Sequence, residues 1–304
     1  MPVLLTLAVS TWNRAERLRR LLTSVEAATP PPVPWEVLVV DNNSTDATRA
    51  VASELAGRLP LRYVFEPVQG SSAARNRALQ EASGDLVVFI DDDVTIDADF
   101  LATYAAASSA HPDAAFFGGT IEVRFEQPEP TWVHFDPRSL VSLFGQLHID
   151  PDCLSVGAEK VPYGANFAVR RSRVGEARFD PALGVKGKQR INGEETLFFA
   201  QLLGAGATGR WLPDAVVHHW IPPDLATVTH LWRYFVGMGR MQAHVRGCGA
   251  SVAPSVVAGD SAGAVVAHLL HAALRRALHK PSWVGQLRLA AVAFGEHRAR
   301  SETK

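Results

Sequence analysis

Four apolar residues run directly into three carboxylates where the chain reads Val87-Val88-Phe89-Ile90-Asp91-Asp92-Asp93-Val94. A continuous apolar run of this kind is typical of a strand covered on both faces of a sheet. Three adjacent carboxylates repel one another and are costly to remove from water without a cation. Mg²⁺ or Mn²⁺ would relieve that cost, because these ions prefer carboxylate oxygens and are commonly held together with substrate phosphates. We predict a buried strand that delivers acidic groups to the edge of a sheet; the alternative is a solvated acidic turn.

Length and composition are those of an ordinary globular protein. The chain has 304 residues, 47% of them hydrophobic, which is enough for one large domain or two smaller ones. Thirty basic residues balance thirty-one acidic ones, so the net charge of −1 gives no reason to expect a nucleic-acid partner. Two cysteines, Cys153 and Cys248, lack metal-ligand spacing and favour a reducing compartment. The first apolar segment is interrupted at Asn13-Arg14, which argues against a signal peptide or membrane span.

Apolar and helical segments alternate through the first hundred residues. Apolar runs at 3–9, 36–40, 61–65 and 86–90 are separated by segments of helical period at 15–27, 45–57 and 71–82. This alternation predicts an α/β fold with a mainly parallel sheet flanked by helices. Ligands of such sheets bind beyond the carboxyl ends of the strands. Polar residues follow three strand ends, at 10–14, 41–46 and 91–93, so we expect these ends to converge on one site.

The middle and the end of the chain have a different character. Further elements are expected at 97–110 (helix), 114–124 (strand), 164–169, a helix from Glu194, and strands at 208–212 and 215–217. Residues 125–161, which are rich in proline and aromatics, predict a long ordered loop or subdomain covering the site, and residues 184–193 a loop. The last eighty or so residues predict a helical extension with helices at 224–246, 262–279 and 282–298.

Several motifs occur in the order typical of one family. They are Val9-Ser10-Thr11-Trp12-Asn13-Arg14, Asp41-Asn42-Asn43-Ser44-Thr45-Asp46, Gly70 with Ala74-Arg75-Asn76, Asp91-Asp92-Asp93, Gly164-Ala165-Asn166 and Glu194-Glu195. Through them the chain resembles family 2 glycosyltransferases of the GT-A fold over approximately residues 3–240, and the order is harder to obtain by chance than any single motif. The resemblance implies a catalytic domain over 1–222, with a nucleotide-sugar half at about 1–125 and an acceptor half at about 126–222, followed by a helical region at 223–304.

The resemblance also implies a nucleoside diphosphate sugar as donor, with UDP- or dTDP-sugars expected, and inversion by single displacement. The implied donor-binding residues are Thr11, Asn13, Arg14, Asp41, Asn43, Arg75, Asp91 and Asp92. Asp93 would bind the Mn²⁺ or Mg²⁺ that neutralises charge on the departing diphosphate. His218-His219 resembles a distal histidine that completes the metal shell in some members; a structural histidine pair is the alternative.

On the acceptor side, the resemblance implies a loop at Gly164, Ala165 and Asn166 and a catalytic base at Glu194-Glu195. An acceptor hydroxyl is a poor nucleophile until its proton is removed, and a positioned carboxylate contributes on the order of 10²–10⁴-fold. The family pattern usually reads Glu-Asp with the second residue as base. We therefore expect Glu195 to be the base, with Glu194 as the alternative. The sequence does not identify the acceptor, which would offer a hydroxyl or an amine.

Other functions fit part of the sequence. Asp91-Asp92-Asp93-Val94-Thr95 also matches the nucleophile motif of haloacid-dehalogenase-type phosphohydrolases, although three strand units precede it. A non-catalytic nucleotide-sugar binding protein would keep Asp41 and the acidic triplet without needing a base. A sugar nucleotidyltransferase or a Rossmann dehydrogenase is disfavoured, because residues 9–14 contain no glycine.

The C-terminal segment is basic and apolar. Seven Lys/Arg and two Glu between Arg275 and Lys304 give a net charge of +5 among apolar side chains. Such helices can lie on an anionic membrane, form a homodimer contact or cover the catalytic domain. Asp260, His268 and His271 interrupt the best apolar window, so we expect no spanning helix. The expected location is cytoplasmic, with or without peripheral membrane contact.

Overall fold

The computed structural model describes residues 5–136, 141, 143–150, 155–157, 160–187, 189–247 and 261–302. The chain divides into two compact units, one of residues 1–124, 146–181 and 194–220 and the other of residues 125–145, 182–193 and 221–304. The segments 125–145 and 182–193, which we assigned from sequence to the catalytic domain, group with the C-terminal helices. Cys153, Cys248 and Asp260 lie outside the described residues.

The first unit is built on a sheet of nine strands in the order β3-β2-β1-β4-β8-β6-β11-β5, with β7 (Ser155–Val156) beside β11. Its first half is parallel: β1 (Leu5–Thr11) lies between β2 (Trp35–Asp41) and β4 (Leu86–Asp91), and β3 (Leu61–Phe65) flanks β2. Most residues of β1, β2 and β4 are buried, which explains their continuous apolar runs. The α/β architecture predicted for the first hundred residues, a mainly parallel sheet flanked by helices, is confirmed.

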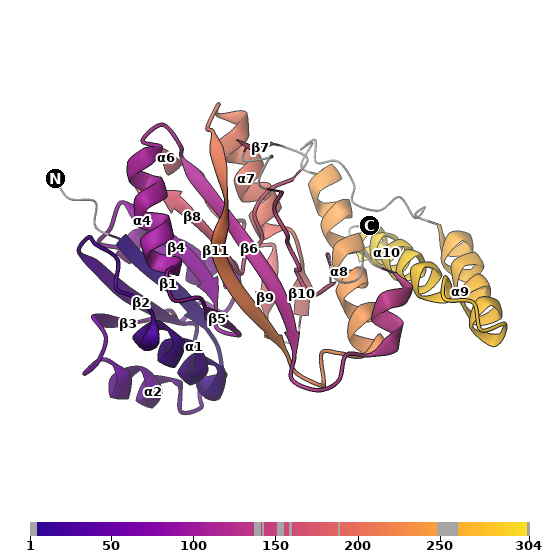
Figure 1. Cartoon of the computed structure of the whole chain (residues 1–304). Helices are drawn as coiled ribbons and strands as arrows, with labels where there is room; N and C mark the ends of the chain where they lie inside the picture. The colour runs from indigo at the N-terminus through magenta and orange to yellow at the C-terminus, as the bar shows by residue number, and fades with distance from the viewer. Residues whose placement is uncertain are drawn as a thin grey trace. The chain divides into compact units, whose positions relative to one another are not determined.

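Three helices connect these strands: α1 (Ala15–Ala27), α2 (Thr48–Leu55) and α3 (Ser71–Glu81). Successive crossovers from β1 to β3 step in one direction, and α3 returns the chain to β4 on the other side of β1. Because such crossovers are right-handed, α1 and α2 share one face of the sheet, where Figure 1 shows them together, and α3 covers the other. The buried face of α1 shows the spacing of a one-sided helix: Leu18, Leu21, Leu22 and Val25.

The direction of the strands changes beyond β4. The next strand, β8 (Phe167–Arg170), runs antiparallel to both β4 and β6 (Phe116–Phe125). Because β8 is antiparallel to β4, the first residue of β8 lies at the edge of the sheet where β4 ends. Phe89 of β4 accordingly lies opposite Phe167 of β8. The loop that contains Gly164 precedes β8 and therefore reaches the same edge of the sheet as the acidic triplet.

The strand β11 (Gly209–Ile221) is continuous, whereas we predicted two strands with the histidine pair after the second. Pro213 interrupts the apolar run but does not end the strand, and its carbonyl accepts a hydrogen bond from Thr120 Oγ1. An unpredicted short strand, β5 (Val94–Ile96), follows the acidic triplet and pairs antiparallel with β11. This register sets His219 opposite Val94.

Three more helices complete the first unit: α4 (Phe100–Ala110), α6 (Arg171–Val174) and α7 (Glu194–Gly204). Stacked aromatic rings fill the core next to α7, with ring centroids 4.1 Å apart for Phe179 and Phe198 and 4.8 Å apart for Phe89 and Phe167. Since Glu194 and Glu195 open α7, this packing fixes where the acidic pair lies.

The second unit consists mainly of helices: η1 (Thr131–Phe135), α8 (Val228–Gly247), α9 (Ala262–Ala277) and α10 (Trp283–Glu302), with a hairpin of β9 (Gly184–Lys186) and β10 (Gln189–Ile191). The hairpin occupies the segment we predicted as a loop. Glycines let α8 and α10 approach closely, since a Cβ on Gly239 would lie 2.1 Å from the carbonyl oxygen of Val292. A buried ion pair of 2.7 Å joins Arg288 to Asp136. Among the described helices, none has the length and apolar character needed to cross a membrane.

Candidate active site

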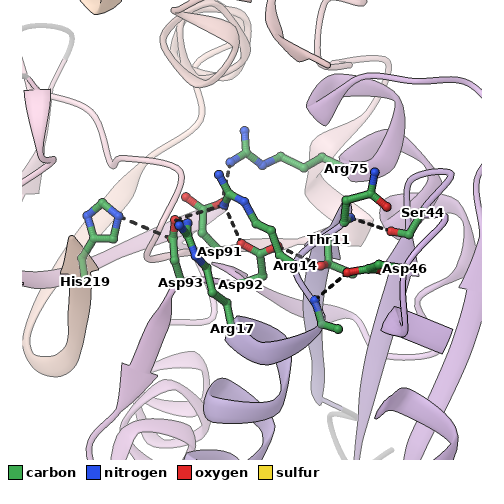
Figure 2. A network of polar contacts seen from close by, with 12 residues as sticks. Thr11, Arg14, Arg17, Ser44, Asp46, Arg75, Asp91, Asp92, Asp93 and His219 are labelled. Carbon is green, nitrogen blue, oxygen red and sulfur yellow. Dashed lines mark hydrogen bonds and ion pairs between the residues drawn. The ribbon is translucent and has the colours of Figure 1, made fainter. Parts of the chain in front are cut away.

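The three consecutive aspartates begin at the last residue of β4, Asp91, and lie beside the start of α1 (Figure 2). Thr11 Oγ1, at the end of β1, donates a 2.8 Å hydrogen bond to Asp92 Oδ2. Arg14 Nη1 donates to Asp92 Oδ1 at 2.7 Å and to Asp93 Oδ2 at 3.1 Å. The ends of the first and fourth strands therefore meet, as expected for neighbouring parallel strands.

Asp93 is buried among basic side chains (Figure 2). Arg17 Nη1 lies 3.4 Å from its Oδ2, and His219 Nε2 lies 3.4 Å from its Oδ1. Burial alone would raise the pKa of Asp93, but His219, Arg14 and Arg17 hold it well below its usual range, so the carboxylate stays ionised. We did not single out Arg17 from sequence, although it lies three residues after Arg14 and hence on the same helix face.

The pair Asp93 and His219 fits a divalent metal ion. Asp93 Oδ1 is buried and has no hydrogen-bond partner among the described residues. Carboxylate oxygen and imidazole nitrogen are ordinary ligands of Mn²⁺. The described residues contain no group of three or more His, Cys, Asp or Glu suited to a metal ion. The two side chains would share the ion with phosphate oxygens and water, which is a common arrangement for such ions.

The neighbouring histidine, His218, points elsewhere. Its Nε2 lies 2.8 Å from Asp97 Oδ1 and its Nδ1 lies 3.3 Å from Glu122 Oε2. Successive residues of a strand face opposite sides of the sheet. Of the two histidines predicted as metal ligands, the structure brings only His219 to Asp93.

Arg75 connects the acidic triplet to the acidic pair. It is buried, and its Nη2 donates to Asp91 Oδ1 at 3.1 Å. Its Nη1 donates to Glu194 Oε1 at 3.1 Å and to Glu195 Oε1 at 2.9 Å. The guanidinium also lies over the ring of Phe179, 5.8 Å from its centroid. One cation therefore joins groups that we assigned to the donor side and to the acceptor side.

Glu195 combines burial with a neighbouring negative charge. Burial and Glu194 raise its pKa to about 7, against the opposing effect of Arg75. A carboxylate with a pKa near neutrality can exchange protons at physiological pH. Glu194 is more fully enclosed and also accepts a hydrogen bond of 3.3 Å from Ser71 Oγ.

The loop before β8 lies against this pair. A Cβ on Gly164 would come within 2.1 Å of Glu195 Oε1 and 2.4 Å of Arg75 Nη2, so only glycine leaves the two side chains where they are. Ala165 is buried. The fully buried amide of Asn166 accepts from the Tyr104 hydroxyl and donates to two carbonyl oxygens. Asn166 thus anchors the loop, and Gly164 is the member of the motif that meets the acidic pair.

The end of β2 forms a cluster next to Thr11, with which Asp41 is in register. Asp41 is buried and accepts a 2.6 Å hydrogen bond from the Tyr63 hydroxyl, a partner not foreseen from sequence. Asn13 and Asn43 are exposed and have positive φ angles of 51° and 70°, a conformation that asparagine tolerates better than most residues. Asn13 Oδ1 accepts a 2.7 Å hydrogen bond from Thr45 N, which joins the loops after β1 and β2 at the surface.

Asn42 is a buried residue that we did not single out. Its Oδ1 accepts from Gly70 N at 2.7 Å, and its Nδ2 donates to the carbonyl of Val68 at 2.6 Å. It therefore ties the end of β2 to the loop that starts α3 and so helps to position Arg75. The sequence does not distinguish Asn42 from the other polar residues of the stretch 41–46.

Comparisons with known proteins agree with this geometry. The sequence profile described as "Glycosyl transferase family 2" matches residues 6–172. The chain is 30% identical over 230 residues to "Succinoglycan biosynthesis protein ExoM" of Rhizobium meliloti, a match covering 74% of this chain and 69% of that protein. "Glycosyltransferase AglE" of Haloferax volcanii is 37% identical over 87 residues, or 28% of this chain and 29% of that protein.

Solved structures resemble the fold over nearly the whole chain. The mannosyltransferase PcManGT from Pyrobaculum calidifontis, in complex with GDP-Man and Mn²⁺, aligns with a TM-score of 0.62 and 20% identity over 97% of this chain and 87% of that one. Residues 1–349 of S. aureus TarS in complex with UDP-GlcNAc give a TM-score of 0.56 and 17% identity over 98% and 92% of the two chains. The fold is that of GT-A transferases, and the haloacid-dehalogenase alternative is set aside. With the profile matching more than half of its length, this chain belongs to glycosyl transferase family 2 and is a glycosyltransferase.

Proposed function

We propose that the protein moves a sugar from a nucleoside diphosphate sugar, UDP- or dTDP-linked, to an acceptor hydroxyl or amine by a single in-line displacement with inversion. Residues of the 1–125 half would bind the donor, and residues of the 126–222 half the acceptor. The observation that carries the proposal is the position of Arg75, which contacts both Asp91 and Glu195. It sets a carboxyl group suited to be a base next to the edge where the acidic triplet lies. Solved structures of similar fold that hold GDP-Man or UDP-GlcNAc support a nucleotide-sugar donor.

On the donor side, Asp93 and His219 would hold Mn²⁺ or Mg²⁺. The bound ion would supply Lewis-acid stabilisation of the diphosphate. Arg14 and Arg17, already beside Asp93, would add positive charge for the phosphate oxygens. Asp41, together with the exposed Asn13 and Asn43, would meet the nucleoside, and the Thr11 hydroxyl would keep Asp92 in place.

On the acceptor side, Glu195 would take the proton from the attacking hydroxyl or amine. The acceptor atom would form a bond to the anomeric carbon while the bond from that carbon to the diphosphate oxygen breaks. The nucleoside diphosphate would leave on the opposite face, which inverts the anomeric configuration. Gly164 would leave the acceptor a path to Glu195, since a side chain there would fill the space beside its Oε1.

A thermal-shift panel tests the donor half of the proposal. UDP, dTDP, GDP and CMP are each added with and without Mn²⁺ to the wild type and to Asp93→Asn. Binding to the folded state stabilises it by about 2.7 kcal/mol at a hundredfold excess over the dissociation constant. We expect stabilisation by UDP or dTDP that requires the metal and disappears in Asp93→Asn. Stabilisation by CMP alone, or by no nucleotide, would contradict the proposal.

A second measurement separates a transferase from a silent binding protein. Glu195→Gln should keep the metal-dependent stabilisation by the donor and lose hydrolysis or transfer of the donor sugar by 10²-fold or more, about the contribution of a general base. Glu194→Gln tests the alternative base, and a larger loss of turnover there than in Glu195→Gln would assign the role of base to Glu194. Equal turnover in wild type and Glu195→Gln would remove Glu195 from the mechanism.

A further inference from the structure

The helix α9 of the second unit exposes a wide apolar face. Its exposed large side chains are Val266 at 55%, Leu269 at 39%, Leu270 at 65%, Leu274 at 58% and, at the C-cap, Leu278 at 56% exposure. At about 100° per residue these five, with Ala273 and Ala277, fall within roughly half of the helix circumference. We call this surface the α9 leucine face. Contiguous exposed apolar surface of this kind marks an interaction site in a folded protein.

The opposite side of α9 is already used. It buries Val265 and Ala272 against α10, beside which α9 lies in Figure 1. Polar contacts accompany this packing: His268 Nδ1 lies 3.0 Å from Gln286 Oε1 of α10, and Arg275 Nη1 donates to Ser282 Oγ, just before α10, at 2.7 Å. The leucine face therefore points away from the only helix that the described contacts place beside α9, and its exposure follows from the way α9 packs.

The charge around the face has one sign. No aspartate or glutamate occurs between Ser261 and Gly295, a stretch that holds Arg275, Arg276, Lys280 and Arg288. Arg288 is engaged with Asp136, so the other three give the end of α9 its positive charge. The guanidinium of Arg276 lies 5.1 Å from the centre of the Trp283 ring. Leucines flanked by cations and a tryptophan are the composition of a helix that lies in the interface of an anionic bilayer.

We propose that the α9 leucine face is a membrane-docking surface, which inserts its leucines into an anionic leaflet while the exposed Arg276 and Lys280 contact lipid phosphates. A second copy of the chain is the less suitable occupant, because the segment offers no carboxylate to complement these cations, whereas an anionic leaflet does. The helix would lie in the plane of the surface and not cross it, in keeping with its partly polar, packed side. This surface is independent of the transferase chemistry.

The test is flotation of the full chain with vesicles of phosphatidylcholine alone or with about 30% phosphatidylglycerol added. The double variant Leu270→Ser/Leu274→Ser removes two exposed side chains from the face. Val68→Ser, at a residue 62% exposed in the first unit, is the matched control for loss of one exposed apolar side chain. Arg276→Gln/Lys280→Gln tests the charge. Far-UV melting of each variant verifies that the fold is retained.

We expect the wild type and Val68→Ser to float with the anionic vesicles and not with the neutral ones. Partitioning should fall about tenfold or more in Leu270→Ser/Leu274→Ser, since two apolar side chains would no longer be buried. It should fall about fivefold for each charge removed, and further with added salt. Absence of flotation, or equal flotation of the leucine variant, would overturn the proposal. So would a dimer in sedimentation velocity that dissociates in the leucine variant while no vesicle binding occurs.

Discussion

Arg75 and Glu195 lie 120 residues apart in the chain, yet Arg75 Nη1 donates a hydrogen bond of 2.9 Å to Glu195 Oε1. The pair depends on two supports that come from different elements. Asn42 holds the loop before α3, and Gly164 leaves room for the two side chains. Because Arg75 also contacts Asp91, a change in the charge of Glu195 is felt at the end of β4.

Arg75→Gln should destabilise the protein strongly. The substitution leaves Glu194 and Glu195 without their buried cation, which typically costs about 3–5 kcal/mol. Urea unfolding measures the effect. The matched control is Arg77→Gln on the same helix, where a partly exposed 2.9 Å pair with Glu81 is lost; its cost should be below about 1 kcal/mol. Similar losses for the two variants would show that Arg75 is not the centre of a buried network.

The rate of sugar transfer should depend on pH through Glu195. Its pKa is raised to about 7, and only the ionised form can accept a proton from the acceptor. We therefore expect kcat/KM to fall tenfold per pH unit well below that value and to level off above it. Initial rates from pH 5 to pH 9 at saturating metal give the profile. A plateau extending below pH 5 would mean that another group is the base.

The contribution of Glu195 to the stability of the fold should decrease with rising pH, whereas the rate of sugar transfer should increase. The pKa of Glu195 is raised from its ordinary value of 4.5 to about 7, so the folded protein binds more protons than the unfolded chain between these values. The contribution of Glu195 to stability is present below pH 4.5 and is lost as pH rises through 7. Glutamine does not titrate. The free energy of unfolding of Glu195→Gln, relative to that of the wild type, should therefore rise by about 3 kcal/mol from pH 4.5 to pH 8. Urea unfolding at each pH measures this difference. A constant difference across that range would contradict the raised pKa.

The two adjacent histidines should behave differently. His219→Ala removes the side chain 3.4 Å from Asp93 and should weaken Mn²⁺-dependent donor binding by about tenfold or more. His218→Ala removes contacts to Asp97 and Glu122 only, so metal dependence should not change. Calorimetric titration of Mn²⁺ in the presence of UDP compares the two. Loss of metal binding in His218→Ala alone would reverse our assignment.

Gly164→Ala should lower turnover more than donor binding. The added methyl would displace Glu195 Oε1 or Arg75 Nη2, and a shift of about 1 Å in a reacting group can cost on the order of 10²-fold. Gly157→Ala is the matched control, because no atom lies within 4 Å of the added carbon. Steady-state rates and donor-induced thermal shifts are compared for both. Normal turnover in Gly164→Ala would show that Glu195 tolerates displacement.

The parallel half of the fold was readable in the sequence because its strands are buried on both faces and separated by one-sided helices. The triplet Asp91-Asp92-Asp93 could be placed for the same reason, since a continuous apolar run ends there. What the sequence did not reveal depends on pairing at a distance. Arg17 meets Asp93 only because α1 lies beside the end of β4, and the Tyr63–Asp41 contact requires the register of β2 and β3.

The second half of the chain was less readable because its strands pair with distant segments. Pro213 suggested a break in a strand that is continuous, and the β9-β10 hairpin has too few residues to show a period. The grouping of 182–193 with the C-terminal helices follows from packing alone, as at Gly237, where a Cβ would lie 2.7 Å from the carbonyl oxygen of Arg190.

The pairing of β5 with β11 has a consequence for how the metal ligand that we propose, His219, could change over time. A one-residue slip of β11 against β5 would set His218, in place of His219, opposite Val94. Such a slip normally moves every side chain of a strand to the other face of the sheet. Here an imidazole would still lie beside Asp93 after the slip. Because two histidines are adjacent, either of them could occupy this position. The loss of stability in such a slip would come from displaced buried neighbours such as Val217 and not from loss of the imidazole.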